Sequence, residues 1–143
     1  MSRYRKLKLK HQKEFESLPI VYAFGEEQFN KAMKKLGLEP SDIDKVCSLF
    51  GCGDILLKKD VPLYHEMSNR HRRELEEAIA EDKSGTEFIF DMFVSALEDH
   101  EYFYTGDAED ALRSLGISLT RIQKDKRLRR GFELACRHQM NPN

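Results

Sequence analysis

Apolar residues recur at three- and four-residue steps along much of the chain, a spacing typical of amphipathic helices. In residues 2–18 this pattern predicts a basic N-terminal helix with an apolar stripe formed by Tyr4, Leu7, His11 and Phe15. Pro19 ends the predicted helix, because proline has no backbone N–H to donate and restricts the residue before it.

The helical pattern returns in several later segments. It predicts helices over residues 25–37, residues 61 to about 82, residues 107–116, and residues 120 to about 138 with a break near Asp125. Another helix is predicted to begin with the stretch 86–104. Glycines at 37 and 116 are typical of helix C-caps. The segment 86–104 is apolar on nearly every side over Phe88–Leu97, and we therefore expect this helix at the centre of the fold.

The region between residues 19 and 60 reads differently. The short apolar run 20–24 fits either a strand or a buried connector, and residues 43–46 predict a short helical turn. Gly51 and Gly53 lie between two apolar runs at 47–50 and 55–57, which predicts a small β-hairpin. The fold class that follows is mainly α: one compact helical domain over residues 1–143 with a minor β-hairpin.

Charge is distributed very unevenly, although the net charge is only −1. Residues 1–13 carry six bases and no acid, residues 74–110 carry thirteen acids and one base, and residues 111–143 carry eight bases and two acids. Both ends of the chain are therefore basic, and a strongly acidic segment separates them. Such a segment is either a solvated face, a binding surface, or a surface that the basic ends cover and neutralise.

Two segments of the chain resemble each other, 32–45 and 111–124. Each has the order expected for a helix, a glycine cap, an apolar residue, an N-cap and a second short helix. In the second copy, Leu112, Gly116 and Ile122 also have the spacing of a DNA-binding helix-turn-helix. Structural packing and DNA binding both remain open for this copy, although few side chains suited to reading base edges follow it.

No catalytic or metal-binding constellation is recognisable. The five histidines are scattered, no phosphate-binding loop or nucleophile motif occurs, and the three cysteines form no CxxC pair. We therefore expect no catalytic residue, no metal, no cofactor and no enzymatic activity. The absence of an apolar run of about 18 residues and of a secretory signal predicts no membrane association and a cytoplasmic location, with the cysteines reduced.

The densest aromatic cluster is HEYFYTGD at residues 100–107. Its three successive aromatic residues cannot all face one core, so we expect at least one near the surface. The tyrosine hydroxyls would then either fix the turn between two helices or take part in an interface, where tyrosine is favoured.

Three stretches carry a resemblance to a known family: YAFGEEQFNKAMKKLGL, HRRELEEAIAEDKSGTEFIFDMF and DHEYFYTGDAEDALRSLGIS. With them, most of the chain resembles uncharacterised small proteins encoded by phages and conjugative elements of gut Firmicutes. The resemblance implies an accessory protein that acts on a host or rival defence system or on the element's own gene control. It implies no particular functional residue.

Two hypotheses of function follow. The first is a non-enzymatic binder of a host or competitor protein, such as an anti-CRISPR or other anti-defence inhibitor. Its partner would be a nucleic-acid-binding protein, attracted by acidic residues that we assume to be exposed. These are Glu74, Glu77, Glu81, Asp82, Asp99, Asp107, Glu109 and Asp110. The alternative is a helix-turn-helix-like DNA-binding regulator. Its phosphate-binding residues would be Arg121, Lys124, Lys126, Arg127, Arg129 and Arg130.

Overall fold

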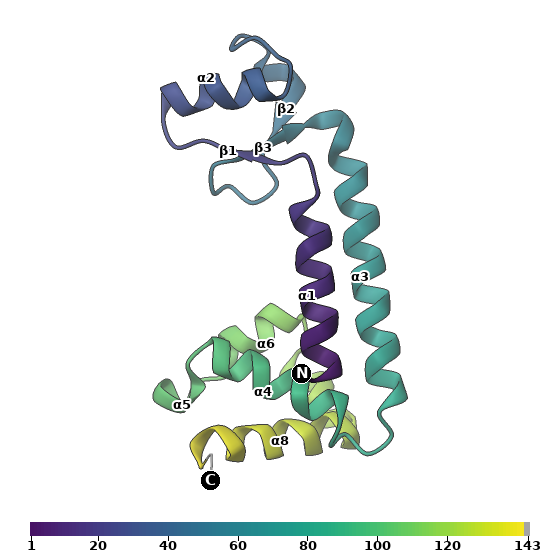
Figure 1. Cartoon of the computed structure of the whole chain (residues 1–143). Helices are drawn as coiled ribbons and strands as arrows, with labels where there is room; N and C mark the ends of the chain where they lie inside the picture. Colours follow the sequence, from purple (N-terminus) through teal and green to yellow (C-terminus); the bar gives the residue numbers. More distant parts are fainter. Residues whose placement is uncertain (142–143) are drawn as a thin grey trace. The chain divides into compact units, whose positions relative to one another are not determined.

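The computed structural model describes residues 1–141 of the chain, and the fold is mainly α with a small antiparallel sheet (Figure 1). The long helices are α1 (Arg3–Glu16), α2 (Glu26–Lys35), α3 (Val61–Glu81), α4 (Phe88–Asp99) and α8 (Lys126–Met140). The shorter ones are α5 (Tyr102–Thr105), α6 (Glu109–Leu115), α7 (Leu119–Lys124) and the 3-10 turns η1 (Ile43–Lys45) and η2 (Lys58–Asp60). The predicted fold class is confirmed.

Three short strands form the sheet in the order β1-β3-β2. They are β1 (Val21–Tyr22), β2 (Val46–Cys47) and β3 (Asp54–Leu57). The predicted hairpin corresponds to β2 and β3, which pair antiparallel with Val46 opposite Leu57. The run at 20–24, which fitted a strand or a connector, contains β1, and Val21 pairs with Ile55 on the other edge of β3.

The contacts within the chain form two compact units. The first consists of Met1–His11 together with the chain from Arg72 onward, and the second is Gln12–His71. The boundary falls inside α1 and α3, so each of these helices contributes residues to both units. The prediction of one domain concerns cooperative folding and stays a prediction.

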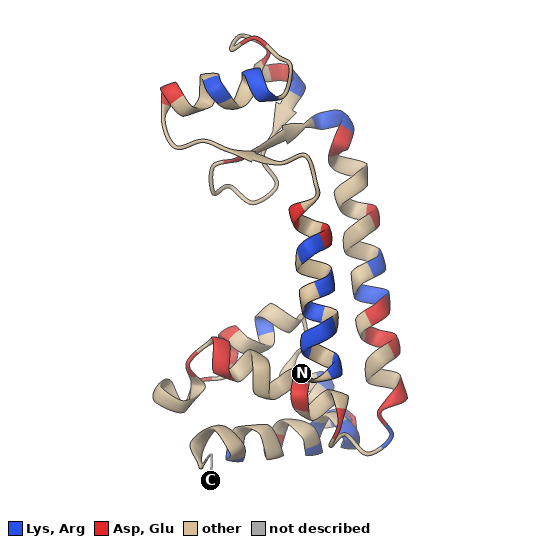
Figure 2. Ribbon diagram, in the orientation of Figure 1, with Lys and Arg blue, Asp and Glu red and all other residues tan. Residues whose placement is uncertain are grey.

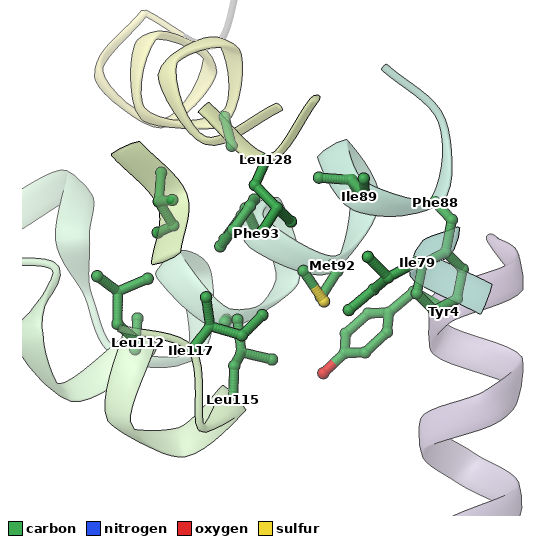
Figure 3. Close-up of a cluster of buried hydrophobic side chains, with 14 of the residues drawn as sticks. Tyr4, Ile79, Phe88, Ile89, Met92, Phe93, Leu112, Leu115, Ile117 and Leu128 are labelled. Carbon is green, nitrogen blue, oxygen red and sulfur yellow. The ribbon is translucent and has the colours of Figure 1, made fainter. Parts of the chain in front are cut away.

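The core of the first unit is built around α4, as its apolar pattern predicts (Figure 3). Ile89, Met92 and Phe93 of this helix are completely buried. They pack with Tyr4 of α1, Ile79 of α3 and Leu128 of α8, among others (Figure 3). Tyr4, which begins the predicted stripe of α1, is 8% exposed and meets the Phe88 ring edge-on at 5.7 Å between centroids.

Helix α8 approaches the start of α4 so closely that only glycine fits at the contact. A Cβ added to Gly131 would lie 2.5 Å from the backbone oxygen of Gly85 and 2.6 Å from a methyl carbon of Ile89. Gly85 itself has φ +82° and faces the backbone of Arg127. The turn between α3 and α4 is therefore fixed against α8 by backbone contact.

The two similar segments end their first helices with the same hydrogen bonds. Gly37 and Gly116 have φ +76° and +66°, and the next residue in each copy donates its N–H to a carbonyl five residues earlier. The second copy continues into α7, where the Ser118 hydroxyl accepts the N–H of Arg121 as an N-cap. Leu112 and Ile122 are buried, so the helix-turn-helix-like segment packs by its apolar residues.

Two helix boundaries are set by single residues. The break near Asp125 is confirmed, because its carboxylate accepts the N–H groups of Arg127 and Leu128 and so starts α8. The helix that begins in the stretch 86–104 ends at Asp99, since Glu101 adopts a left-handed conformation with φ 55° that cannot continue a right-handed helix. Within residues 1–141, no helix has the length and apolar character needed to cross a membrane.

Candidate protein-binding surface

The acidic residues predicted as contacts, together with Glu98 and Glu101, fall into three groups with different surroundings. One is buried in the turn after α3, a second lies along α3 and α4 within reach of the basic helix α1, and a third lies on α5 and α6. Figure 2 shows the bases of α1 and the acids in the last part of α3. Which acids remain available to a partner depends on which group they belong to.

Asp82 is the buried acid, and the assumption that it is exposed is wrong. The residue is only 2% exposed, and its carboxylate accepts hydrogen bonds from the backbone N–H groups of Gly85, Glu87 and Ile89 at 2.9–3.1 Å. Burial alone would raise the pKa of Asp82, but these hydrogen bonds hold that pKa below its ordinary value. Asp82 therefore organises the turn between α3 and α4 and offers no surface charge.

The second group is paired with the basic N-terminal helix. Arg3 of α1 binds Glu81 at 2.9 Å, and Lys10 binds Glu74 at 3.0 Å. Two further bases of α1 reach α4, where Arg5 binds Glu98 at 3.0 Å and Lys8 binds Asp99. The possibility that a basic end covers the acidic surface is thus realised by α1. Among the predicted contacts on α3, Glu77 is the one acid for which residues 1–141 supply no ion pair.

The third group surrounds two exposed aromatic side chains. Phe103 is 56% exposed and Tyr104 is 85% exposed, both on the single turn α5. Glu101 precedes this turn and Asp107 follows it, and both are exposed. The prediction that at least one aromatic residue of 102–104 lies near the surface is confirmed, and two do. The Tyr104 hydroxyl makes no hydrogen bond with residues 1–141 and does not fix the turn. The Tyr102 hydroxyl, in contrast, is hydrogen-bonded to the Cys136 side chain of α8.

The acids after α5 support α6 and stay accessible. Asp107 accepts the N–H of Glu109 at 2.9 Å, which places its carboxylate at the start of α6. Glu109 and Asp110 both bind Arg113 at 3.0 Å, and all three side chains are at least 70% exposed. We call residues 101, 103, 104, 107, 109 and 110 the acidic–aromatic surface.

A backbone feature holds the acidic–aromatic surface in its present form. Among the described residues, Glu101 is the one non-glycine residue with a positive φ, and Gly106 at the other end of α5 has φ 68°. A left-handed non-glycine residue costs on the order of 1 kcal/mol, and such conformations cluster at functional sites. Sequence reasoning missed this feature, because no residue type at 101 marks it.

The six bases of the alternative hypothesis divide into two kinds. Arg121 holds Glu76 through two hydrogen bonds of 2.9 and 2.7 Å, and Arg127 donates to the carbonyls of Ile79 and Asp82 at the end of α3. These two arginines are used inside the fold. The other four are exposed and have no ion pair with residues 1–141: Lys124, Lys126, Arg129 and Arg130.

The histidines and cysteines are distributed without a common site. His71 binds Glu14 at 3.0 Å in the second unit, and His138 packs its ring against Phe90 in the first. Within residues 1–141, no three histidine, cysteine, aspartate or glutamate side chains are grouped in a way that could hold a metal ion.

Comparison with known proteins places the chain in a family but assigns it no activity. No curated protein and no solved structure matches the chain. The model of a family of unknown function, DUF7659, matches residues 3–138, and the chain therefore belongs to that family.

Proposed function

We propose that the protein is a non-enzymatic accessory protein of a phage or conjugative element, and that it binds a host or competitor protein through the acidic–aromatic surface. The observation that carries the proposal is the pair Phe103 and Tyr104, exposed at 56% and 85% between accessible carboxylates. Aromatic residues are enriched among the residues that dominate the energetics of protein interfaces, and adjacent exposed apolar side chains rimmed by polar ones are typical of interaction sites.

The chemistry of the surface indicates what kind of partner it would take. Glu101 and Asp107 form no ion pair within residues 1–141, and Glu109 and Asp110 share the single base Arg113, so the surface keeps a net negative charge. This charge would attract a basic partner and orient it before contact. Proteins that bind nucleic acid present such basic surfaces. An anti-defence role, including inhibition of a CRISPR nuclease, is consistent with this partner and with the resemblance to gut Firmicutes phage proteins, and we place its action in the cytoplasm.

The acids of α3 contribute less to this proposal than the sequence suggested. Arg3 and Lys10 already neutralise Glu81 and Glu74, and Asp82 is buried. A charge reversal that includes Asp82 would unfold the turn after α3 and would not report on binding. The surface to be tested is therefore the one on α5 and α6.

A pull-down from host lysate, followed by measurement of affinity for the recovered partner, tests the proposal. We expect the double variant Phe103→Ala, Tyr104→Ala to lose about 30-fold or more in affinity, since one aromatic hot-spot residue contributes about 2 kcal/mol or more. The matched control removes two exposed apolar side chains elsewhere, Ile43→Ala and Leu119→Ala, which are 65% and 51% exposed. Equal affinity of all three proteins would refute the proposal.

A second variant separates the contribution of charge from that of the aromatic pair. Replacing Glu101, Glu109 and Asp110 by lysine should slow association and abolish its dependence on salt. The control reverses three exposed acids of the second unit instead: Glu39, Asp44 and Glu66. An association rate that falls equally in both variants would show that net charge, and not this surface, attracts the partner.

A further inference from the structure

The bases at the start of α8 form an exposed patch that the fold does not use. Lys126, Arg129 and Arg130 lie three and four residues apart and therefore share one face of the helix. The opposite face carries Leu128, Gly131 and Ala135, which are buried against the core. With Lys124 at the end of α7, these three bases make up what we call the basic patch, visible in blue at the beginning of α8 in Figure 2.

Nothing in residues 1–141 neutralises this patch. None of its four members makes an ion pair or a side-chain hydrogen bond there, although Asp125 lies among them. That carboxylate is already bound to Arg127 at 3.2 Å. Glu133, one turn further along, is the next acid of α8 and limits the patch on that side.

The position of the patch opposes the stability of the helix. The first turn of α8 contains no acid, and basic side chains near a helix N-terminus interact unfavourably with its dipole. Mutual repulsion of four neighbouring bases adds to this cost. Neither packing nor ion pairing within residues 1–141 uses these bases, and a ligand with dense negative charge would complement them.

The geometry favours one of the three common polyanionic surfaces. A basic helix binds a membrane most strongly by inserting its apolar face, but the apolar face of α8 is occupied by the core, which leaves only electrostatic attraction to anionic lipids. Single-stranded nucleic acid is bound by stacking bases on aromatic side chains, and the patch contains none. Duplex DNA remains, since its phosphates need only accessible positive charge.

We propose that the basic patch binds the phosphate backbone of duplex DNA without reading its sequence. Lysine and arginine supply the phosphate contacts, and contacts to phosphate carry no sequence information. The proposal is independent of the acidic–aromatic surface, because the two sets of residues do not overlap.

Fluorescence anisotropy with two unrelated duplexes of equal length provides the test. Four phosphate contacts predict that affinity falls about 100-fold between 50 and 200 mM salt, equally for both sequences. Replacing Lys124, Lys126, Arg129 and Arg130 by glutamine should weaken binding at 50 mM salt at least tenfold and reduce the salt slope by about 3 to 4. The exposed, unpaired state of these residues leaves the fold intact, which circular dichroism checks.

Two controls make the result decisive. The variant Lys34→Gln, Lys35→Gln, Lys58→Gln, Lys59→Gln makes the same change in net charge at exposed positions of the second unit and should bind like the parent protein. The variant Arg129→Lys, Arg130→Lys keeps the charge and should keep the affinity. Equal weakening by both glutamine variants, tighter binding to single strands or to phosphatidylserine vesicles, or no binding to duplex at 50 mM salt would overturn the proposal.

Discussion

The two basic ends of the chain look alike in sequence but have opposite roles in the structure. The bases of α1 face acids of α3 and α4 and pair with them, at 2.9–3.0 Å for Arg3, Arg5 and Lys10. The bases of the patch on α7 and α8 face away from the core and form no ion pair within residues 1–141, since the Asp125 carboxylate beside them is bound to Arg127. A run of charge thus acquires its role from the surface that its helix faces.

The largest effect on stability is expected for an acid that is bound by backbone N–H groups and not by a basic side chain. Replacing Asp82 with Ala would leave the N–H groups of Gly85, Glu87 and Ile89 without their acceptor in a buried turn. We expect a loss of about 3 kcal/mol or more in the free energy of unfolding, measured by urea denaturation. Glu77→Ala is the matched control and should change stability by less than about 0.5 kcal/mol. Equal stability of the two variants would contradict the role given to Asp82.

A smaller effect is expected within α8, where one arginine is structural and its neighbours are not. Arg127→Ala removes hydrogen bonds to the carbonyls of Ile79 and Asp82, and we expect it to cost about 2 kcal/mol. Arg130→Ala removes an exposed base without a partner and should leave stability unchanged within about 0.5 kcal/mol. Urea denaturation of both variants measures the difference, and a reversed order would refute the division of these bases into two kinds.

The contrast between the two ends themselves is tested by removing four bases from each. Replacing Arg3, Arg5, Lys8 and Lys10 with Gln should cost about 1–2 kcal/mol in total, since exposed ion pairs contribute about 0.2–1 kcal/mol each. The same change at the basic patch should leave stability unchanged or slightly raise it, because repulsion between like charges is relieved. Added salt should reduce the first effect. If both quadruple variants lose the same stability, the two ends do not differ as described.

Local chemistry made much of this fold predictable from sequence. Pro19, Gly116 and Asp125 each mark a helix boundary through their own backbone or side-chain properties, and each boundary is found near the predicted place. The sequence allowed the bases of α1 to pair with the acidic segment but could not show that they do, because Lys10 and Glu74 are 64 residues apart in sequence. Long-range packing decides which charges meet.

Asp82 shows how a local signal can be overlooked. Its position after Glu77 and Glu81 suggests one more exposed acid at the end of a helix. Ser84 and Gly85 follow it, however, and an aspartate two or three residues before serine and glycine is typical of a side-chain-capped turn. Its burial also depends on the close approach of Gly131 to Gly85, which no local pattern contains. The exposure of Phe103 and Tyr104 likewise depends on the break at Glu101.

The smallest effect concerns an acid of α1 in the second unit, where the roles of the two helices are reversed. There α1 supplies the acid and α3 the bases: Glu14 binds Arg70 and, at 3.0 Å, His71. The hydrogen bonds from Arg70 and then His71 lower the pKa of Glu14 to about 2, against 4.5 for the unperturbed group. Because the folded-state pKa is lowered, its stabilising contribution is present above pH 4.5 and is lost as the pH falls from about 4.5 to about 2.

Urea denaturation at several pH values checks this sign. The parent protein should lose more stability than Glu14→Gln over the interval from pH 4.5 to pH 2, since glutamine does not titrate. Glu16→Gln, at an exposed position two residues further along α1, is the matched control and should follow the parent protein. If Glu14→Gln and Glu16→Gln gave the same pH dependence, the ion pairs between α1 and α3 would contribute no measurable stability in the second unit. Charge would then organise α1 in the first unit alone.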